Sequence, residues 1–169
     1  MKSITQILTT VSAGIFSSAA LAEPLDVGAA LPTVEQKNQD DHAVKLAEVG
    51  SAGYLLVYFY PKADTPGCTK QACSLRDSYV SLTDKGVRIL GVSMDKVPAQ
   101  KAFKEKYKLP FDLLADSDGI VVKAFGVPNA MGFSKRQAFL FKDGKLVWRD
   151  LSAATDKQAE DVLKILSAK

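Results

Sequence analysis

Two short and almost wholly apolar runs, Tyr54–Tyr60 and Val87–Ser93, constrain the fold more than any other feature of the chain. Continuous apolar runs of this length are typical of parallel strands covered on both faces of a sheet. Between them, apolar residues recur at helical spacing: Ala72, Leu75, Tyr79 and Leu82. Gly86 then provides a helix stop. We therefore predict two parallel strands joined by one helix, a βαβ unit.

The second half of the chain continues this alternation. A helix is predicted to begin at Pro98 and to end before Leu109 and Pro110. Beyond it, Gln137–Lys142 and Lys145–Arg149 are predicted as strands, because the Asp-Gly pair between them is a strong signal for a two-residue hairpin turn.

A final helix is expected to start at Thr155, whose spacing to Gln158 matches a capping box. The resulting order is strand, helix, strand, an inserted helix and strand region, then strand, strand and helix. This is the order of the thioredoxin fold, an α/β architecture in which helices flank a central mixed sheet. Val34–Leu46 and Leu109–Ala124 would be additions to it.

The N-terminus is predicted to be a targeting segment rather than part of the fold. After a basic Met-Lys start, residues 4–20 are uncharged and apolar or small, and an A-x-A cleavage signature ends at Ala22. A transmembrane anchor needs about 20 strongly apolar residues, and Ser and Thr dilute this stretch. We therefore predict a signal peptide over residues 1–22 and a single domain over residues 23–169, which in a bacterium would be periplasmic or secreted.

The charge of the chain limits its partners. Its 22 Lys+Arg against 19 Asp+Glu give a net charge of +3, without a long block of one sign. The basic footprint of a nucleic-acid-binding protein is therefore missing, and we expect neither a nucleic-acid partner nor membrane association after signal cleavage. The chain is long enough to bury a core without a disulfide. We therefore predict a chemical role for its two cysteines, Cys68 and Cys73, in preference to a stabilising disulfide.

The most informative segment is Tyr58–Asp77, YFYPKADTPGCTKQACSLRD. It leaves a strand, turns, and enters the predicted helix, where Thr65 suits the N-cap and Pro66 the first helical position. Cys68 would then lie in the first helical turn, where unpaired backbone N–H groups and the positive end of the helix dipole favour an anion. We therefore predict that Cys68 is readily ionised to a thiolate.

Cys73 follows Cys68 by five residues. On an intact helix this spacing separates two Cα atoms by roughly 8 to 9 Å, whereas a disulfide needs less than about 7 Å. A bond between the two cysteines would require the first turns of the helix to unwind, which suits a catalytic cycle better than a permanent link. Cys73 also lies next to Ala72 on the apolar stripe, so a packing role stays open.

Pro61, Thr65 and Cys68 together form P-x-x-x-T-x-x-C, which resembles the active-site signature of the peroxiredoxins. The wider run FYPKADTPGCTKQACSLRD, with GVSMDK, ADSDG and RQAFLFKDGK, is similar to the subgroup called bacterioferritin comigratory protein or peroxiredoxin Q. The resemblance covers nearly all of residues 23–169. It implies a peroxidase of hydrogen peroxide and organic hydroperoxides that uses thiols and no cofactor or metal.

The resemblance also implies roles for single residues. Cys68 would be the peroxidatic thiol that becomes a sulfenic acid, and Cys73 the resolving thiol that forms an intramolecular disulfide with it. Arg136, just before the Gln137–Lys142 strand, matches the family's arginine and would donate hydrogen bonds to the thiolate and the peroxide. Its neighbour Lys135 is the alternative in that loop.

Thr65 and Pro61 complete the implied site. The Thr65 hydroxyl would accept a hydrogen bond from the peroxide O–H, and Pro61 would shield the pocket from water while contributing no N–H. The implied partners are a peroxide substrate and a thioredoxin-like dithiol protein that reduces the disulfide. The subgroup is commonly monomeric, and we expect a monomer.

Two other functions stay open. A secreted thiol–disulfide oxidoreductase of the thioredoxin type would use C-x-x-C, whereas this chain has C-x-x-x-x-C. A non-catalytic assembly protein of the same fold would keep a static Cys68–Cys73 bond. A Cys-His pair or a metal site has little support: His42, the only histidine, lies in a polar turn, and Asp116 with Asp118 matches only part of a calcium loop.

Overall fold

The computed structural model describes residues 23–168, so the predicted signal peptide lies outside the described residues. Its elements in chain order are β1 (Glu35–Lys37), β2 (Ala43–Lys45), α1 (Leu46–Val49), β3 (Tyr54–Phe59), α2 (Pro66–Asp77), α3 (Tyr79–Thr83), β4 (Val87–Ser93), α4 (Val97–Tyr107), β5 (Asp112–Ala115), α5 (Ile120–Ala124), β6 (Asn129–Ala130), β7 (Phe133–Ser134), β8 (Gln137–Lys142), β9 (Lys145–Asp150) and α6 (Gln158–Ser167).

A five-stranded mixed sheet of order β5-β4-β3-β8-β9 forms the centre of the molecule. The strands β3, β4 and β5 are parallel, and β8 and β9 are antiparallel to their neighbours. Both predicted apolar runs become inner strands, and the predicted hairpin turn has positive φ at Asp143 (48°) and Gly144 (75°), as a type I′ turn requires. The predicted thioredoxin fold is confirmed.

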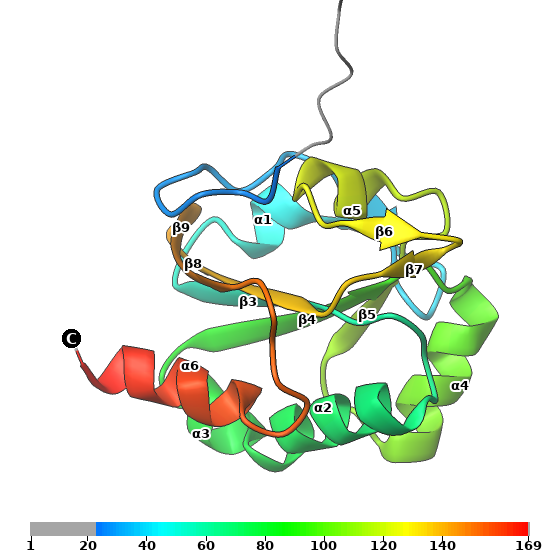
Figure 1. Ribbon diagram of the computed structural model, residues 1–169. Coiled ribbons are helices and arrows are strands. Elements are labelled where there is room, and N and C mark those ends of the chain that lie inside the picture. The colour runs from blue at the N-terminus through cyan, green and yellow to red at the C-terminus, as the bar shows by residue number, and fades with distance from the viewer. Residues whose placement is uncertain (1–22, 169) are drawn as a thin grey trace, which may run out of the picture.

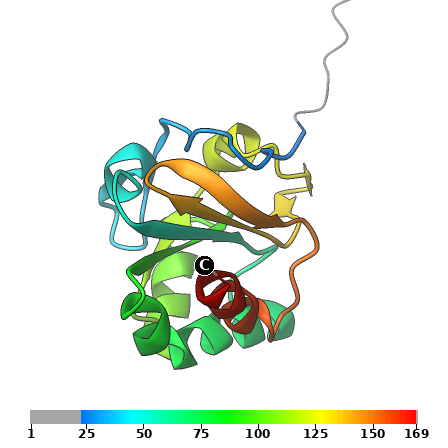
Figure 2. The same cartoon turned by 90° about the vertical axis from the view of Figure 1, so that its left-hand side faces the viewer.

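Side chains of β3 alternate between the two faces of this sheet. Leu56 and Tyr58 meet the helices α2, α3, α4 and α6 on one face, and Leu55 and Val57 meet α1 and α5 on the other. Figure 1 shows the two helical layers below and above the sheet, and the turned view in Figure 2 shows α6 (red) nearly end-on below the sheet. None of the helices within residues 23–168 is long and apolar enough to span a membrane.

The prediction of a single helix between β3 and β4 is wrong, because this segment forms two helices, α2 and α3. At Ser78 the backbone leaves helical geometry (φ −97°, ψ 7°), so that α2 ends at Asp77 and α3 begins at Tyr79. The bend redirects the chain, and Leu82 of α3 still packs in the same core as Leu75 of α2.

The predicted start of the last helix at Thr155 is also wrong. Residues 155–157 form a turn, and α6 begins at Gln158 without a side-chain cap. The capping box does not form because Gln158 is buried and its side chain is bonded to Gln71 of α2 instead. A tertiary hydrogen bond therefore takes the place of the expected local one.

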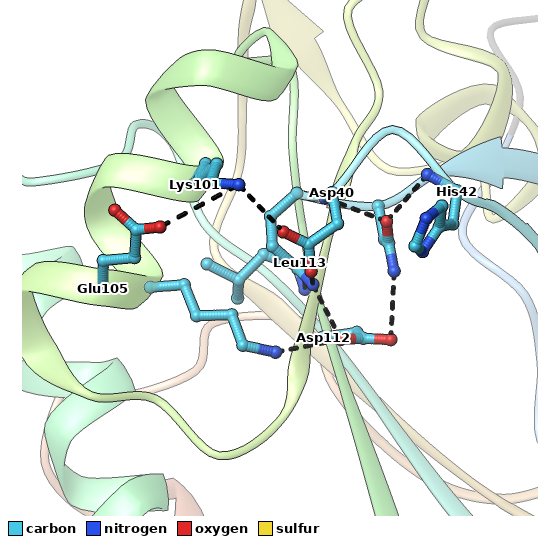
Figure 3. A network of polar contacts seen from close by, with 9 residues as sticks. Asp40, His42, Lys101, Glu105, Asp112 and Leu113 are labelled. Carbon is cyan, nitrogen blue, oxygen red and sulfur yellow. Dashed lines mark hydrogen bonds and ion pairs between the residues drawn. The ribbon is translucent and has the colours of Figure 1, made fainter.

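The two predicted additions contribute at one edge of the fold. The segment Val34–Leu46 supplies the β1–β2 hairpin, and Leu109–Ala124 supplies β5, which extends the central sheet, and α5. The turn of this hairpin packs beside α4 and the start of β5, where a network of polar contacts joins the three segments (Figure 3). His42 is exposed at this turn, as predicted.

Candidate active site

The loop that follows β3 carries the chain into α2 and places Cys68 in the first turn of that helix. Thr65 has extended backbone geometry (φ −92°, ψ 153°) at the N-cap, and Pro66 is the first helical residue, both as predicted. The first N–H groups of a helix have no acceptor within it. The Cys68 thiol therefore lies at the end of α2 that stabilises negative charge.

Hydrogen bonds from the region of α4 hold this loop in place. The Ala63 N–H donates to Asp95 Oδ2 at 2.7 Å. Asp64, with a left-handed backbone (φ 57°), accepts from Lys106 Nζ at 2.8 Å and from Tyr107 Oη at 2.7 Å. These two hydrogen bonds lower the pKa of Asp64. The loop that begins at the half-buried Pro61 is therefore anchored on the side away from α2.

The Cys68 thiol is buried, with 2% of the residue exposed, and it meets the guanidinium of Arg136. Arg136 Nη2 donates to Cys68 Sγ at 3.4 Å, and Nη1 donates to Gln71 Oε1. Lys135 points to solvent. Of the two cations that the sequence offered, Arg136 is the one at the thiol, where its charge favours the thiolate.

Gly67 makes room for this contact. A Cβ atom at Gly67 would lie 3.3 Å from Arg136 Nη2, closer than most Cβ contacts. The glycine therefore lets the guanidinium approach the first turn of α2 closely.

The Thr65 hydroxyl has a different partner from the one that an N-cap predicts. It donates to the Lys62 carbonyl at 3.0 Å and makes no cap hydrogen bond to α2. A hydroxyl that donates in this way keeps its lone pairs free to accept. The Thr65 hydroxyl is therefore able to accept a hydrogen bond from another group.

Cys73 is half-buried further along α2, and both thiols are free. The helix runs without a break from Pro66 to Asp77, so the two cysteines lie on one intact helix. At this spacing their Cα atoms are too far apart for a disulfide. The expected bond between them requires α2 to unwind locally.

Buried tyrosines form the sheet side of the thiol's surroundings. Tyr58 and Tyr60 belong to the same core cluster as Cys68, and their rings stack with centroids 5.5 Å apart. Burial raises the pKa of both phenols well above the ordinary value. Both side chains therefore stay neutral, and Arg136 is the charged group that contacts the thiol.

The remaining candidates have structural roles. Within residues 23–168, no cluster of His, Cys, Asp and Glu side chains could hold a metal ion. Asp116 accepts from the N–H groups of Val121 and Val122, at 2.9 and 2.8 Å, and from Gln36. It therefore holds the start of α5 instead of forming part of a calcium loop, and burial raises its pKa.

Sequence reasoning missed three residues of this site: Gly67, Gln71 and Gln158. Gln71 was open to prediction, because it lies three residues after Cys68 and therefore on the same face of the helix. Gln158 was not, because its contact joins residues 87 positions apart in the chain.

The chain matches the model of the AhpC/TSA family over residues 27–149. It is 36% identical over 155 residues to the chloroplastic peroxiredoxin Q of Suaeda salsa, a match that covers 89% of this chain and 72% of the relative. It is 46% identical over 101 residues to the chloroplastic peroxiredoxin Q of Oryza sativa subsp. japonica, but this match spans only 46% of the rice protein, about half its length.

Solved structures give the same result. The crystal structure of peroxidoxin BcpB from Mycobacterium tuberculosis superimposes with a TM-score of 0.79 at 32% identity. The match covers 84% of this chain and 96% of the mycobacterial chain. The similarity therefore includes the central sheet and the helices around the site.

Proposed function

The chain belongs to the AhpC/TSA family, in its peroxiredoxin Q group, and from this premise we propose that it is a peroxidase whose nucleophile is Cys68. The observation that carries the proposal is the contact of 3.4 Å between Arg136 and a buried thiol in the first turn of α2. Hydrogen peroxide and organic hydroperoxides are the proposed substrates.

In the first step, the Cys68 thiolate attacks one oxygen of the peroxide. The S–O bond forms as the O–O bond breaks, so that the sulfur becomes a sulfenic acid and the leaving oxygen takes a proton to depart as water or an alcohol. Arg136 stabilises the charge that moves from sulfur to oxygen. Thr65 accepts from the peroxide O–H, and Pro61 shields the thiol from water.

In the second step, the Cys73 thiol attacks the sulfenic sulfur of Cys68. An S–S bond forms, and the hydroxyl group leaves as water with the proton of the Cys73 thiol. This step follows local unwinding of α2. A thioredoxin-like dithiol protein then reduces the disulfide by thiol–disulfide exchange and becomes oxidised itself.

We also propose that residues 1–22 are a cleaved signal peptide and that residues 23–169 act as a monomer in the periplasm or outside the cell. The support is the uncharged stretch that ends in A-x-A at Ala22. Expression of the full chain in a bacterium, followed by N-terminal sequencing of the periplasmic fraction, tests the cleavage. Size-exclusion chromatography with light scattering tests the monomer.

Rapid mixing of reduced protein with one equivalent of hydrogen peroxide tests the peroxidase proposal. Thiol loss should be far faster than in denatured protein, and intact mass should fall by two hydrogens as the disulfide forms. The Cys68→Ser variant should not react beyond the rate of an ordinary thiol. A rate equal to the denatured control would refute the peroxidase and favour a thiol–disulfide oxidoreductase.

Cys73→Ser tests the resolving role. This variant should react with peroxide as fast as the parent, because its nucleophile is intact, but should stop at a sulfenic acid that a dimedone-type reagent traps. Rapid disulfide formation within the variant monomer is impossible, so failure to trap the sulfenic acid would argue against Cys73 as the resolving thiol.

A further inference from the structure

Two buried glutamines connect the arginine at the thiol to the last helix. Gln71 is completely buried in α2, where its Oε1 accepts from Arg136 and its Nε2 donates to Gln158 Oε1 at 2.8 Å. Gln158 is the first residue of α6 and is 2% exposed. A continuous line of hydrogen bonds therefore runs from α6 through α2 and Arg136 to Cys68.

The donors and acceptors in this line fix its direction. A guanidinium can only donate, so Gln71 must turn its oxygen to Arg136 and its NH₂ group to Gln158. Gln158 must in turn present its oxygen to Gln71, because its own NH₂ group would place two donors face to face. Arg136 thus determines the orientation of both amides.

This orientation leaves one polar group without a partner. Gln158 Nε2 is buried and finds no hydrogen-bond acceptor among residues 23–168. A buried donor without an acceptor destabilises the fold, and an apolar side chain of the same size would avoid that cost only by leaving Gln71 Nε2 without its acceptor. Packing alone therefore does not explain a glutamine at this position, whereas holding Gln71 does.

We propose that Gln158 is a positioning residue that acts through Gln71 on Arg136, and so keeps the guanidinium against the Cys68 sulfur. The inference rests on the proposed peroxidase function. Without the hydrogen bond from Gln71 to Gln158, the Gln71 amide can rotate, and its oxygen no longer anchors Nη1 of Arg136.

The other groups around this line do not replace that anchor. On the solvent side of the contact between α2 and α6, Lys70 Nζ pairs with Asp156 Oδ2 at 2.7 Å, and both side chains are about half exposed. On the sheet side stand the neutral phenols of Tyr58 and Tyr60. None of these bonds Arg136, so the glutamine pair is the connection between α6 and the guanidinium.

The test is Gln158→Met, which keeps the size of the side chain and removes the acceptor. We expect the rate of Cys68 oxidation by hydrogen peroxide to fall on the order of tenfold, since a misplacement of about 1 Å in a reacting group can cost up to about 100-fold. The thermal unfolding midpoint should change little, because the substitution removes one unpartnered donor, Gln158 Nε2, and leaves another, Gln71 Nε2, without its acceptor.

Two further variants separate positioning from packing. Val162→Ala loosens α6 against the same core without touching the amides, and it should lower the unfolding midpoint while leaving the rate unchanged. In a Gln71→Met background, Gln158→Met should have no further effect, because the link is already broken. If Gln158→Met does not fold, Gln158→Asn, whose oxygen cannot reach Gln71, carries the same test.

The inference is overturned if Gln158→Met leaves the rate as in the parent, if Val162→Ala lowers the rate to the same extent, or if the effects of Gln71→Met and Gln158→Met on the rate add in full. Failure of the proposed function looks different, because the parent protein itself would then not react with peroxide faster than its denatured form.

Discussion

Two polar clusters join distant segments of this chain, one around Cys68 and one around Asp112. Asp112, at the start of β5, accepts from Lys104 Nζ of α4 and Gln39 Nε2 of the β1–β2 turn, both at 2.9 Å. A third hydrogen bond comes from Asn38 Nδ2 at 3.3 Å, and the whole network is drawn in Figure 3. Its charges are neutralised by neighbours within the protein.

The cluster around Cys68 is built differently. Its acceptor is a sulfur atom that receives a hydrogen bond from Arg136, and the Thr65 hydroxyl, three residues before Cys68, still has lone pairs free. The line of amides behind Arg136 ends in a donor on Gln158 that has no acceptor within residues 23–168. The protein thus satisfies the carboxylate of Asp112 from three sides, but leaves the thiol's surroundings ready to bind another oxygen. The cluster around Asp112 holds segments of the fold together, whereas we propose that the cluster around Cys68 carries out the reaction.

The largest effect should come from removing the guanidinium. Arg136→Met should lower the rate of Cys68 oxidation by on the order of 100- to 1000-fold, as the loss of a donor to a developing oxyanion typically does. Stopped-flow measurement with hydrogen peroxide checks this. Lys135→Met is the matched control, since that side chain is exposed next to Arg136, and its rate should stay within about twofold of the parent. Equal losses in both variants would contradict the assignment of Arg136.

Asp112→Asn should change stability and not the reaction. Burial raises the pKa of Asp112, but the hydrogen bonds from Lys104 and Gln39 outweigh it and lower the pKa below the ordinary 3.8. A lowered pKa stabilises the fold above about pH 4, and this contribution is lost as the pH falls through the folded-state value. The variant should be less stable at pH 7 by about 1 kcal/mol or less, because the carboxylate is partly exposed and screened.

Urea unfolding of parent and variant at several pH values checks this prediction. The difference between them should shrink as the pH falls below about 4, because Asp112 of the parent then becomes uncharged, as the amide of the variant already is. Asp41→Asn is the control, because Asp41 is exposed on the same turn and pairs with Lys37 at 2.7 Å, a cation that makes no contact with Asp112. A difference in stability that grows as the pH falls would contradict the prediction. A changed rate of Cys68 oxidation by peroxide would contradict it too, because the Asp112 cluster would then affect the reaction.

The contrast also explains what the sequence could predict. The inner strands, the hairpin turn and the place of Cys68 in α2 all depend on local patterns, such as apolar runs, Asp-Gly, and Thr-Pro before a helix. These predictions are confirmed to within one residue. The break at Ser78 and the true start of α6 depend on packing between helices, which no local pattern encodes.

The site divides in the same way. The sequence motif indicated Cys68, Thr65 and Pro61, and the resemblance favoured Arg136, with its neighbour Lys135 as the alternative. The tertiary structure decides between the two cations, because the segment before β8 lies beside α2. Its Arg136 side chain contacts the thiol, and its Lys135 side chain is exposed to solvent. A second tertiary contact, between α2 and α6, diverts Gln158 from the capping box that its spacing predicted.

The smallest effect is expected at the exposed edge of the Cys68 cluster. Lys70 pairs with Asp156, and Ser74 Oγ donates to the Asp156 carbonyl at 3.4 Å, so both contacts hold the part of α2 that must unwind before Cys73 can reach Cys68. Lys70→Ala should leave the first oxidation unchanged, because the ion pair touches neither the thiol nor Arg136. It should speed disulfide formation by at most a few-fold, because an exposed ion pair contributes little.

Salt offers an independent check on Lys70→Ala. Added salt screens exposed ion pairs, so disulfide formation in the parent should speed up toward the rate of the variant, while the variant itself responds less. The two steps separate in a stopped-flow trace, with peroxide consumption first and thiol pairing second. If Lys70→Ala slowed the first step, the ion pair would contribute to the reaction of Cys68 with peroxide. Lys70 and Asp156 would then have to be counted as part of the cluster around Cys68.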